Sequence, residues 1–335
     1  MLPTSSRRIG VLSPSRLERL HCPARVAFEQ LHIGARPSSA AAQLGTAVHL
    51  AVEKLLSGAD SAEAWNAACD ELASRGPDPR RLPGGVRTEL RFQKRSPQLQ
   101  ELVAGLSPVA WLVEEELLSG DGSIGGTADL IVLRDRDLVV IDHKTGFASD
   151  AGVPKPAYER QVRIYAALAS ERFDLPAARG VLMSMAEGVV DVDVTPALVA
   201  AEMAAARSAR QEFNERAPGS QPAAATPQNC QWCDHKARCD AFWDALSETW
   251  RDEVGECVVV ELAAEPQVSA NGLAAMRVEI RAGTTVADGE VVVAEVPEAL
   301  VVGLGAGATM NVTGLRRTKS DRTLRWAPGA MLDTH

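Results

Sequence analysis

Apolar residues recur every three or four positions near the start of the chain, which is the spacing of one face of a helix. Residues 13–31, "SPSRLERLHCPARVAFEQL", follow this spacing after a Ser-Pro-Ser start signal. Residues 41–56, "AAQLGTAVHLAVEKLL", carry a stronger apolar stripe, with His49 at its edge. The pattern predicts an early helical region and then an amphipathic helix.

The pattern then changes to short runs of Val, Ile and Leu bounded by Gly and Asp, which are typical of strands. It returns to helical spacing before a second set of strands, while the polar, Pro-bearing stretch 76–98 shows neither period. The expected strands are 110–119, 129–133, 138–142 and a pair within 180–194, and the expected helices are 157–171 and 195–216. We therefore expect an α/β fold with a mixed central sheet flanked by helices.

The C-terminal part has a different pattern. A Pro/Ala segment, "APGSQPAAATPQ", is followed from about residue 250 by five short β-like runs separated by Gly, Asn or Asp. This pattern predicts a small all-β domain that resembles an OB-type barrel, a fold that often binds single strands. A structural or protein-docking barrel is an equal alternative. We expect two domains, residues 1–245 and 250–335.

Composition narrows the class of protein. The chain has 335 residues, of which 46% are hydrophobic, enough for a large core and a second, smaller domain. It has no apolar run long enough to span a membrane, and its N-terminal segment lacks the apolar centre of a secretory signal. We expect a cytoplasmic protein without a membrane partner.

The net charge of −9 argues against general nucleic-acid binding through charge alone. Two stretches differ from this average, with six Lys or Arg in residues 80–95 and five in residues 316–325. Either stretch could face phosphates, although such runs are more often solvated surface.

The runs "DLIVL" and "LVVID" contain the main candidate site. A hairpin that pairs Leu133 with Leu138 places Asp129 opposite Asp142, with side chains about 5 Å apart on one face. Two such carboxylates repel each other unless a cation binds between them or one takes up a proton. Lys144 follows two residues later and lies on the same face. The arrangement suits a divalent cation beside a lysine.

These residues carry a family resemblance. "GGTAD", "IDHKTG" and the later "QVRIY" resemble motifs of the PD-(D/E)XK nuclease superfamily, specifically its RecB-like branch. The resemblance implies a restriction-endonuclease-like core that hydrolyses phosphodiester bonds with Mg²⁺ or Mn²⁺. The second acidic position, usually Glu in the family, is Asp142 here.

The resemblance also assigns roles. Asp129, Asp142 and Lys144 would be catalytic, together with Gln161 and Tyr165, which are four residues apart on one helix face. His49 in "GTAVH" matches a helical histidine of this branch and would bind the metal with Asp129 and Asp142. One of the glutamates at 114–116 could supply a further acid, and the sequence does not select among them.

Three cysteines crowd into "CQWCDHKARC", and a fourth follows a helix start in "LHCPARVAFE". Spacing alone allows a structural zinc, with His235 replacing one cysteine, or reduced thiols. The order of these motifs resembles the iron-sulfur staple of AddB-type and CRISPR-associated RecB-like nucleases. It implies a structural [4Fe-4S] cluster on Cys22, Cys230, Cys233 and Cys239.

The expected function is a metal-dependent deoxyribonuclease that acts on single strands or free ends, in repair, recombination or mobile-element defence. The chain shows no Gly-x-x-x-x-Gly-Lys-Ser/Thr motif, so a helicase partner could supply a motor. One alternative is a non-catalytic DNA-binding or assembly subunit of a helicase-nuclease or CRISPR-type complex. Another is a zinc-stabilised scaffold.

Overall fold

A computed structural model of the protein describes residues 3–31, 39–284, 289–320 and 322–334. The chain divides into two compact units, which we name the sheet unit and the barrel unit. The sheet unit comprises Arg8–Glu18 and Arg36–Glu215, and the barrel unit comprises Met1–Arg7, Arg19–Ala35 and Arg216–His335. Segments far apart in sequence, Arg19–Ala35 and Arg216–His335, thus belong to one unit.

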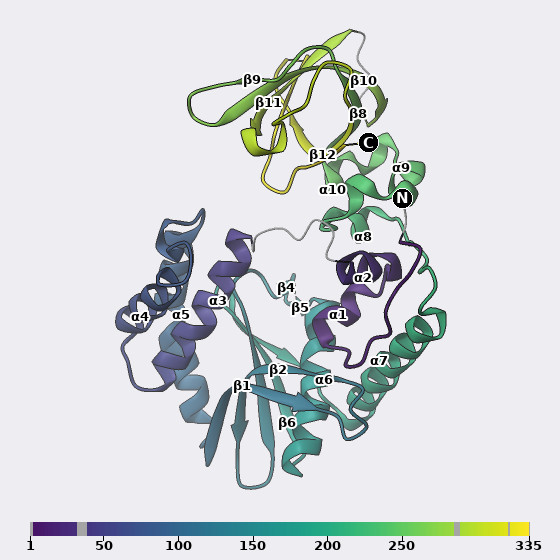
Figure 1. Ribbon diagram of the computed structural model, residues 1–335. Coiled ribbons are helices and arrows are strands. Elements are labelled where there is room, and N and C mark those ends of the chain that lie inside the picture. Colours follow the sequence, from purple (N-terminus) through teal and green to yellow (C-terminus); the bar gives the residue numbers. More distant parts are fainter. Residues whose placement is uncertain (1–2, 32–38, 285–288, 321, 335) are drawn as a thin grey trace. The chain divides into compact units, whose positions relative to one another are not determined.

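The sheet unit is built on a five-stranded mixed sheet, as predicted (Figure 1). Its strands, in spatial order, are β1 (Ala110–Leu118), β2 (Gly125–Leu133), β3 (Leu138–Lys144), β6 (Ala177–Ser184) and β7 (Gly188–Val192). Neighbouring strands are antiparallel except β3 and β6, which are parallel. The helix α6 (Pro156–Phe173) makes the crossover that this parallel pair requires.

Helices cover both faces of this sheet (Figure 1). One face packs on α3 (Ala40–Leu56), α4 (Ser61–Ala73) and α5 (Gly85–Gly105), with Trp65 and Phe92 fully buried between them. The other face packs on α6, which approaches so closely at Gly180 that a Cβ there would lie 2.6 Å from a methyl of Val162. The remaining elements of this unit are α1 (Pro14–Arg19), η1 (Pro79–Arg81), β4 (Ser149–Asp150), β5 (Val153–Pro154) and α7 (Pro196–Arg216).

Two helices lie outside the sequence prediction. The stretch 76–98, described from the sequence only as polar and Pro-bearing, contains most of α5, which continues through Pro97. Proline removes a backbone donor and usually ends a helix, but buried residues at three- and four-residue spacing from Phe92 to Val103 hold this one against the core. The helix α4 was also missed, although a capping box of Asp60 and Glu63 marks its start.

The barrel unit contains a sheet in which five strands close on themselves. In order around the ring these are β8 (Glu256–Leu262), β10 (Leu273–Gly283), β11 (Glu290–Pro297), β13 (Thr323–Arg325) and β12 (Thr309–Arg317). Their inner side chains form an apolar core of mainly Val, Met and Leu. The predicted small β domain is therefore present as a barrel-like sheet. The short strands β9 (Gln267–Val268) and β14 (Met331–Thr334) add to the ring and were not predicted.

The rest of the barrel unit consists of short helices. These are α2 (Pro23–Gln30), α8 (Pro227–Gln231), η2 (Lys236–Arg238), α9 (Asp240–Ala245), η3 (Glu248–Trp250), α10 (Arg251–Val254) and η4 (Glu298–Leu300). The early helical region of the sequence thus forms two helices, α1 and α2, separated at Cys22, where Pro23 begins the second. None of the described helices is long and apolar enough to cross a membrane.

Candidate active site

The predicted hairpin register is confirmed. Strands β2 and β3 pair from Leu133 opposite Leu138 to Leu130 opposite Ile141. Asp129 and Asp142 occupy the next opposed positions at the open end of this hairpin. Because successive side chains of a strand point to opposite faces of the sheet, both carboxylates lie on the face that packs on α6.

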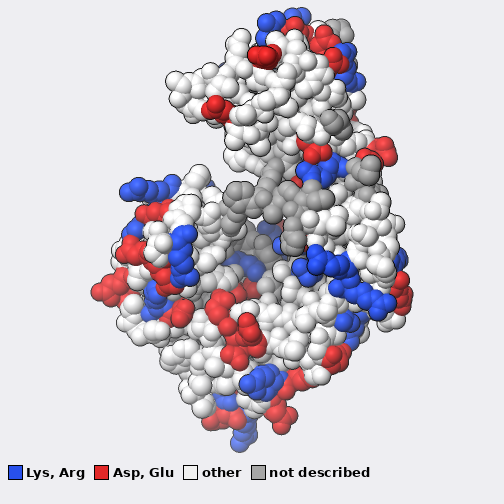
Figure 2. All heavy atoms as spheres, viewed as in Figure 1, with Lys and Arg blue, Asp and Glu red and all other residues white. Residues whose placement is uncertain are grey.

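The neighbouring strand β1 adds a third acid to this line. Pairs between Val113 and Leu130 and between Glu115 and Ala128 flank Glu114 and Asp129, which therefore face each other. We call Glu114, Asp129 and Asp142 the carboxylate row. Glu114 has a φ of 52°, a left-handed backbone that is uncommon for a residue other than glycine and occurs often at functional sites. Figure 2 shows acidic side chains gathered over this part of the sheet.

His49 of α3 meets two members of the carboxylate row. Its Nδ1 lies 2.9 Å from Oε1 of Glu114 and 3.5 Å from Oδ1 of Asp129. Burial lowers the pKa of His49, but its hydrogen bond to the Glu114 carboxylate and the charges of the neighbouring acids together raise it above the usual value. One ligand atom from each of His49, Glu114 and Asp129 lies within 4.8 Å of the others. An imidazole with two carboxylates suits Mn²⁺ or Mg²⁺.

This group of three differs from the expected ligand set of His49, Asp129 and Asp142. The sequence left Glu114 undecided among three adjacent glutamates, and its position opposite Asp129 selects it. The register of β1 on β2 distinguishes Glu114 from its two neighbours. This register depends on the turn between the two strands.

Asp142 is fully buried and has a different partner. Its Oδ2 lies 2.6 Å from Nζ of Lys144, and Oδ1 has no hydrogen-bond partner among the described residues. Burial, and next the charge of Asp129, raise the pKa of Asp142 to about 7. A buried carboxylate oxygen without a donor is costly, and a cation at this place would remove the cost.

Asp129 shifts in the opposite direction. Burial alone would raise the pKa of Asp129. A hydrogen bond with the His143 side chain and the charges of His49 and His143 outweigh burial, so the pKa of Asp129 lies below its usual value. The backbone N–H of His143 also donates to Oδ2 of Asp129 at 2.6 Å. The two acids therefore differ, with Asp129 favouring the ionised form and Asp142 the protonated form, as expected for close carboxylates.

Helix α6 surrounds Lys144 with polar and aromatic groups. Lys144 Nζ donates to Oε1 of Gln161 at 3.0 Å and lies 4.6 Å from the centre of the Tyr158 ring, a cation–π contact. The hydroxyl of Tyr165 lies 3.1 Å from the position that a Cβ would take at Gly126 in "GGTAD". Burial raises the pKa of Tyr165. The predicted Lys144, Gln161 and Tyr165 thus converge here, while Tyr158, three residues before Gln161, was missed.

Gly45 lies one turn before His49 on α3 and faces open space. No described atom lies within 4 Å of the position that a Cβ would take there. Glycine inside a helix costs about 0.5–1 kcal/mol relative to alanine.

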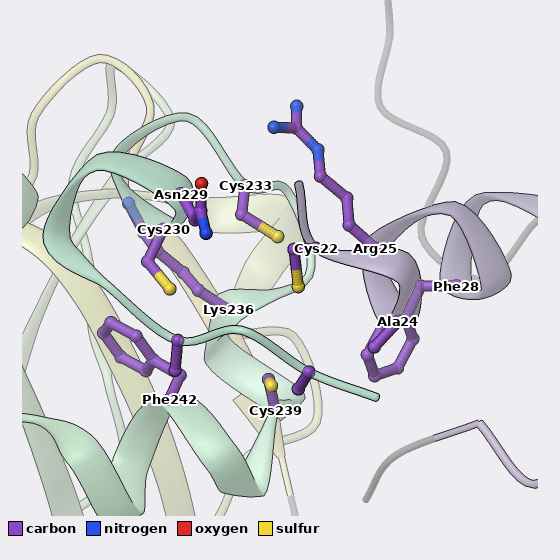
Figure 3. Close-up of a pocket in the computed structure, with 12 residues that line it drawn as sticks. Cys22, Ala24, Arg25, Phe28, Asn229, Cys230, Cys233, Lys236, Cys239 and Phe242 are labelled. Carbon is purple, nitrogen blue, oxygen red and sulfur yellow. The ribbon is translucent and has the colours of Figure 1, made fainter. Parts of the chain in front are cut away.

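The four predicted cysteines meet within the barrel unit. Cys22, Cys230, Cys233 and Cys239 line one cavity, and their side chains point toward a common space (Figure 3). We call this the cysteine pocket. Burial raises the pKa of the Cys230 thiol to about 12, and burial also raises those of Cys233 and Cys239. Buried thiols of this kind ionise only beside a cation, which a metal would supply.

The other candidate ligands lie outside this pocket. His235 stacks on Phe28 with ring centres 5.1 Å apart, and it is not among the lining residues. Cys69 is buried in the core of the sheet unit, and Cys257 is buried beneath the barrel, as expected of small apolar side chains. Among the described residues, the only group of ligand atoms that all lie within 4.8 Å is the one at His49, so the four thiols are farther apart.

The two basic stretches are partly neutralised. In the first, Arg80 pairs with Asp70 and Asp78 at 2.7 and 2.9 Å. In the second, Arg317 pairs with Glu256 and Arg325 with Glu295, and residue 321 lies outside the described residues.

The comparison with protein-family models agrees with this site. The model of the PD-(D/E)XK nuclease superfamily matches residues 11–240. No curated protein matches the chain. Among solved structures, an inferred exonuclease from Eubacterium rectale has 9% identity and a TM-score of 0.46, over 70% of this chain and 88% of its own. A Vibrio cholerae protein has 14% identity and a TM-score of 0.22, over 61% and 55%. The family match covers more than half of the sequence and includes every residue of the carboxylate row, so the chain belongs to the PD-(D/E)XK nuclease superfamily.

Proposed function

We propose that the protein is a metal-dependent deoxyribonuclease that acts on single strands or free ends. The observation that carries this proposal is the convergence of Glu114, Asp129 and His49 beside the Lys144–Asp142 pair. A divalent ion held there would polarise the scissile phosphate and lower the pKa of an attacking water. The buried Oδ1 of Asp142, which lacks a donor, and the three nearby ligand atoms fit such an ion.

The chain's own residues then have distinct roles. Glu114, Asp129 and His49 would hold the ion, and a cation nearby would favour the ionised form of Asp142, whose negative charge would then add to theirs. Lys144, fixed by Asp142, Gln161 and the Tyr158 ring, presents its ammonium to the phosphate or to the attacking water. Gln161 and Tyr158 are positioning residues for Lys144. Tyr165 packs behind them against Gly126.

The pathway belongs to the proposal as well. A nuclease for single strands or ends suits repair, recombination or mobile-element defence, with a helicase partner to separate the strands. A non-catalytic subunit that retains the fold would have no need for an intact site. His49, Asp129, Asp142, Lys144, Gln161 and Tyr165 are all present, which favours the catalytic alternative.

For the cysteine pocket we propose a structural [4Fe-4S] cluster. A zinc tetrahedron with Zn–S bonds of about 2.3 Å places its sulfur atoms about 3.8 Å apart. The four thiols do not all lie within 4.8 Å of one another, which suits a larger group better. Protein purified without oxygen should be brown and contain iron and sulfide. Colourless protein with one bound zinc would contradict the cluster.

We further propose that residues 250–335 form an OB-like domain beside a nuclease domain of residues 1–245. The closed five-strand ring and the single parallel pair, β11 with β13, support this assignment. The barrel would bind DNA strands or a partner protein. Removal of residues 250–335 followed by DNA-binding measurements would separate these two roles.

The proposed activity is tested by incubating the protein with labelled single- and double-stranded DNA and RNA, with Mn²⁺, Mg²⁺ or EDTA. We expect cleavage of DNA that requires the metal. Asp129→Ala and Lys144→Ala should each lower the rate by at least about 100-fold. Glu116→Gln, on the same strand as Glu114 but outside the ligand group, is the matched control and should cut normally. Equal cleavage by the wild type and both alanine variants, or no cleavage under any condition, would contradict the proposal.

A further inference from the structure

A short segment beyond Lys144 carries an exposed aromatic ring next to the proposed active site. Phe147 follows Lys144 by three residues and is 57% exposed. The segment forms the small hairpin of β4 and β5 and leads into α6, which carries Tyr158 and Gln161 (Figure 1). Three residues span at most about 10–11 Å, so the ring lies within reach of a strand bound at Lys144.

The backbone on both sides of Phe147 is fixed. Ser184 Oγ donates to the carbonyl of Gly146 at 2.8 Å, and Lys155 Nζ donates to the carbonyl of Phe147 at 3.0 Å. One carboxylate oxygen of Glu187 accepts the backbone N–H groups of Ala148 at 2.6 Å and Ser149 at 2.7 Å. The ring therefore projects from a segment that hydrogen bonds hold in place.

The surroundings give this ring no partner. Among the described residues, no aromatic or cation–π contact involves Phe147. The neighbouring Ala148 is fully buried and Ser149 nearly so, so the same segment buries small side chains while it exposes the large one. Burial of a phenylalanine normally stabilises a fold, and this position largely forgoes that gain. A single exposed apolar residue is common on surfaces, but here it combines with a fixed backbone and a site for phosphate chemistry.

We infer that Phe147 stacks on a nucleobase of the bound strand beside the bond that is cut. Base–aromatic stacking is independent of sequence because every base has a flat face, and it suits a nuclease that acts on unpaired DNA. The inference rests on the proposed function and adds a positioning contact for the strand. It predicts that substrate positioning depends on one base near the cut, not only on the backbone.

The test uses oligonucleotides in which one residue at a time is abasic, scanned across the cut site. For the wild-type chain, one position should lower kcat/KM by about 5- to 150-fold. Phe147→Ala should lower kcat/KM for the intact strand by a similar factor and show no further loss at that abasic position. Phe147→Trp should restore the wild-type pattern. The control is Val153→Ala. Val153 is an apolar residue of the same hairpin and is 67% exposed, but its side chain has no flat ring that could stack on a base.

A second readout separates failure of stacking from failure of the proposed activity. A 2-aminopurine placed at the same position, with the protein in EDTA, should lose fluorescence on binding to the wild type and not to Phe147→Ala. If the wild type cuts no substrate but quenches in this way, the proposed activity fails and the stacking contact stands. If the wild type and Phe147→Ala respond equally at every abasic position and quench equally, the inference is wrong. All variants should unfold at the wild-type temperature, since the ring is exposed.

Discussion

The carboxylate row and the cysteine pocket hold metal-ligand side chains in opposite surroundings. The carboxylate row begins at an exposed Glu114 and ends at a fully buried Asp142, with Lys144 and Gln161 beside it. The cysteine pocket brings together four thiols and several apolar side chains, and burial raises the pKa of Cys230, Cys233 and Cys239. The row is open to solvent at one end, whereas in the pocket Cys230 is buried and the other three cysteines are partly buried.

We infer from this contrast that the carboxylate row serves catalysis and that the cysteine pocket serves stability. The carboxylate row, with Asp142 buried and Glu114 exposed, can bind an ion and still leave positions on that ion for water and phosphate. The proposed cluster on Cys22 and on the cysteines of residues 230–239 would instead join distant parts of one unit, as a cross-link does. Damage to the row should therefore remove activity without unfolding the protein, and damage to the pocket should do the reverse.

The largest expected effect on stability comes from the pocket. Cys239→Ser should lower the free energy of unfolding by about 2–5 kcal/mol in protein purified without oxygen, because it opens a long closed loop. Thermal and denaturant unfolding measure this change. The folded fraction should retain the wild-type kcat. If Cys239→Ser leaves the free energy of unfolding unchanged, or lowers kcat in molecules that remain folded, the two sites do not have the separate roles that we infer.

The next effect concerns pH and the buried end of the row. The pKa of Asp142 is raised in the folded protein, so the metal-free fold binds a proton that the unfolded chain releases, and stability falls as pH rises from about 4 to about 7. At about 1.4 kcal/mol per pKa unit, the change is at most about 4 kcal/mol. Denaturant unfolding in EDTA at several pH values should show this slope for wild type and a flatter one for Asp142→Asn. Identical slopes would mean that Asp142 stays ionised.

The open end of the row is tested by metal affinity. Glu114→Gln keeps the size of the side chain and removes its charge, so Mn²⁺ should bind about 10- to 100-fold more weakly. Glu116→Gln provides the matched control on the same strand. Isothermal titration with Mn²⁺ gives both affinities. If the two variants bind Mn²⁺ equally, Glu114 is not a ligand and the set expected from sequence, with Asp142, is preferred.

The smallest effect concerns the ring under Lys144. An exposed cation–π contact contributes about 0.5–1 kcal/mol, so Tyr158→Ala should lower kcat by about 2- to 5-fold. Tyr158→Phe keeps the ring and should keep kcat. Equal losses in the two variants would point to the hydroxyl instead.

Much of the sheet unit could be predicted because its signals are local. A four-residue turn fixed the register of β2 and β3, and from it the opposed positions of Asp129 and Asp142. The motif that contains Lys144 lies on the same strand, and Gln161 and Tyr165 share one face of the next helix. These relations need only the period of a strand or a helix.

The remainder depended on tertiary packing. Glu114 was one of three adjacent glutamates, and only the pairing of β1 with β2 and the turned backbone at Glu114 select it. The helix α5 was missed because its polar N-terminal half and Pro97 oppose helix propensity, and packing against the core outweighs them. The strand β14 is short, and its pairing with β12 gives no local signal.

The central claim is that Glu114, Asp129 and His49 bind a catalytic divalent ion. Crystals soaked in Mn²⁺ and measured at the manganese absorption edge test it most directly. The account predicts one anomalous peak within about 2.5 Å of a ligand atom from each of these three residues, which Asp129→Ala abolishes. A peak elsewhere, or none at a Mn²⁺ concentration that supports cleavage, would contradict it.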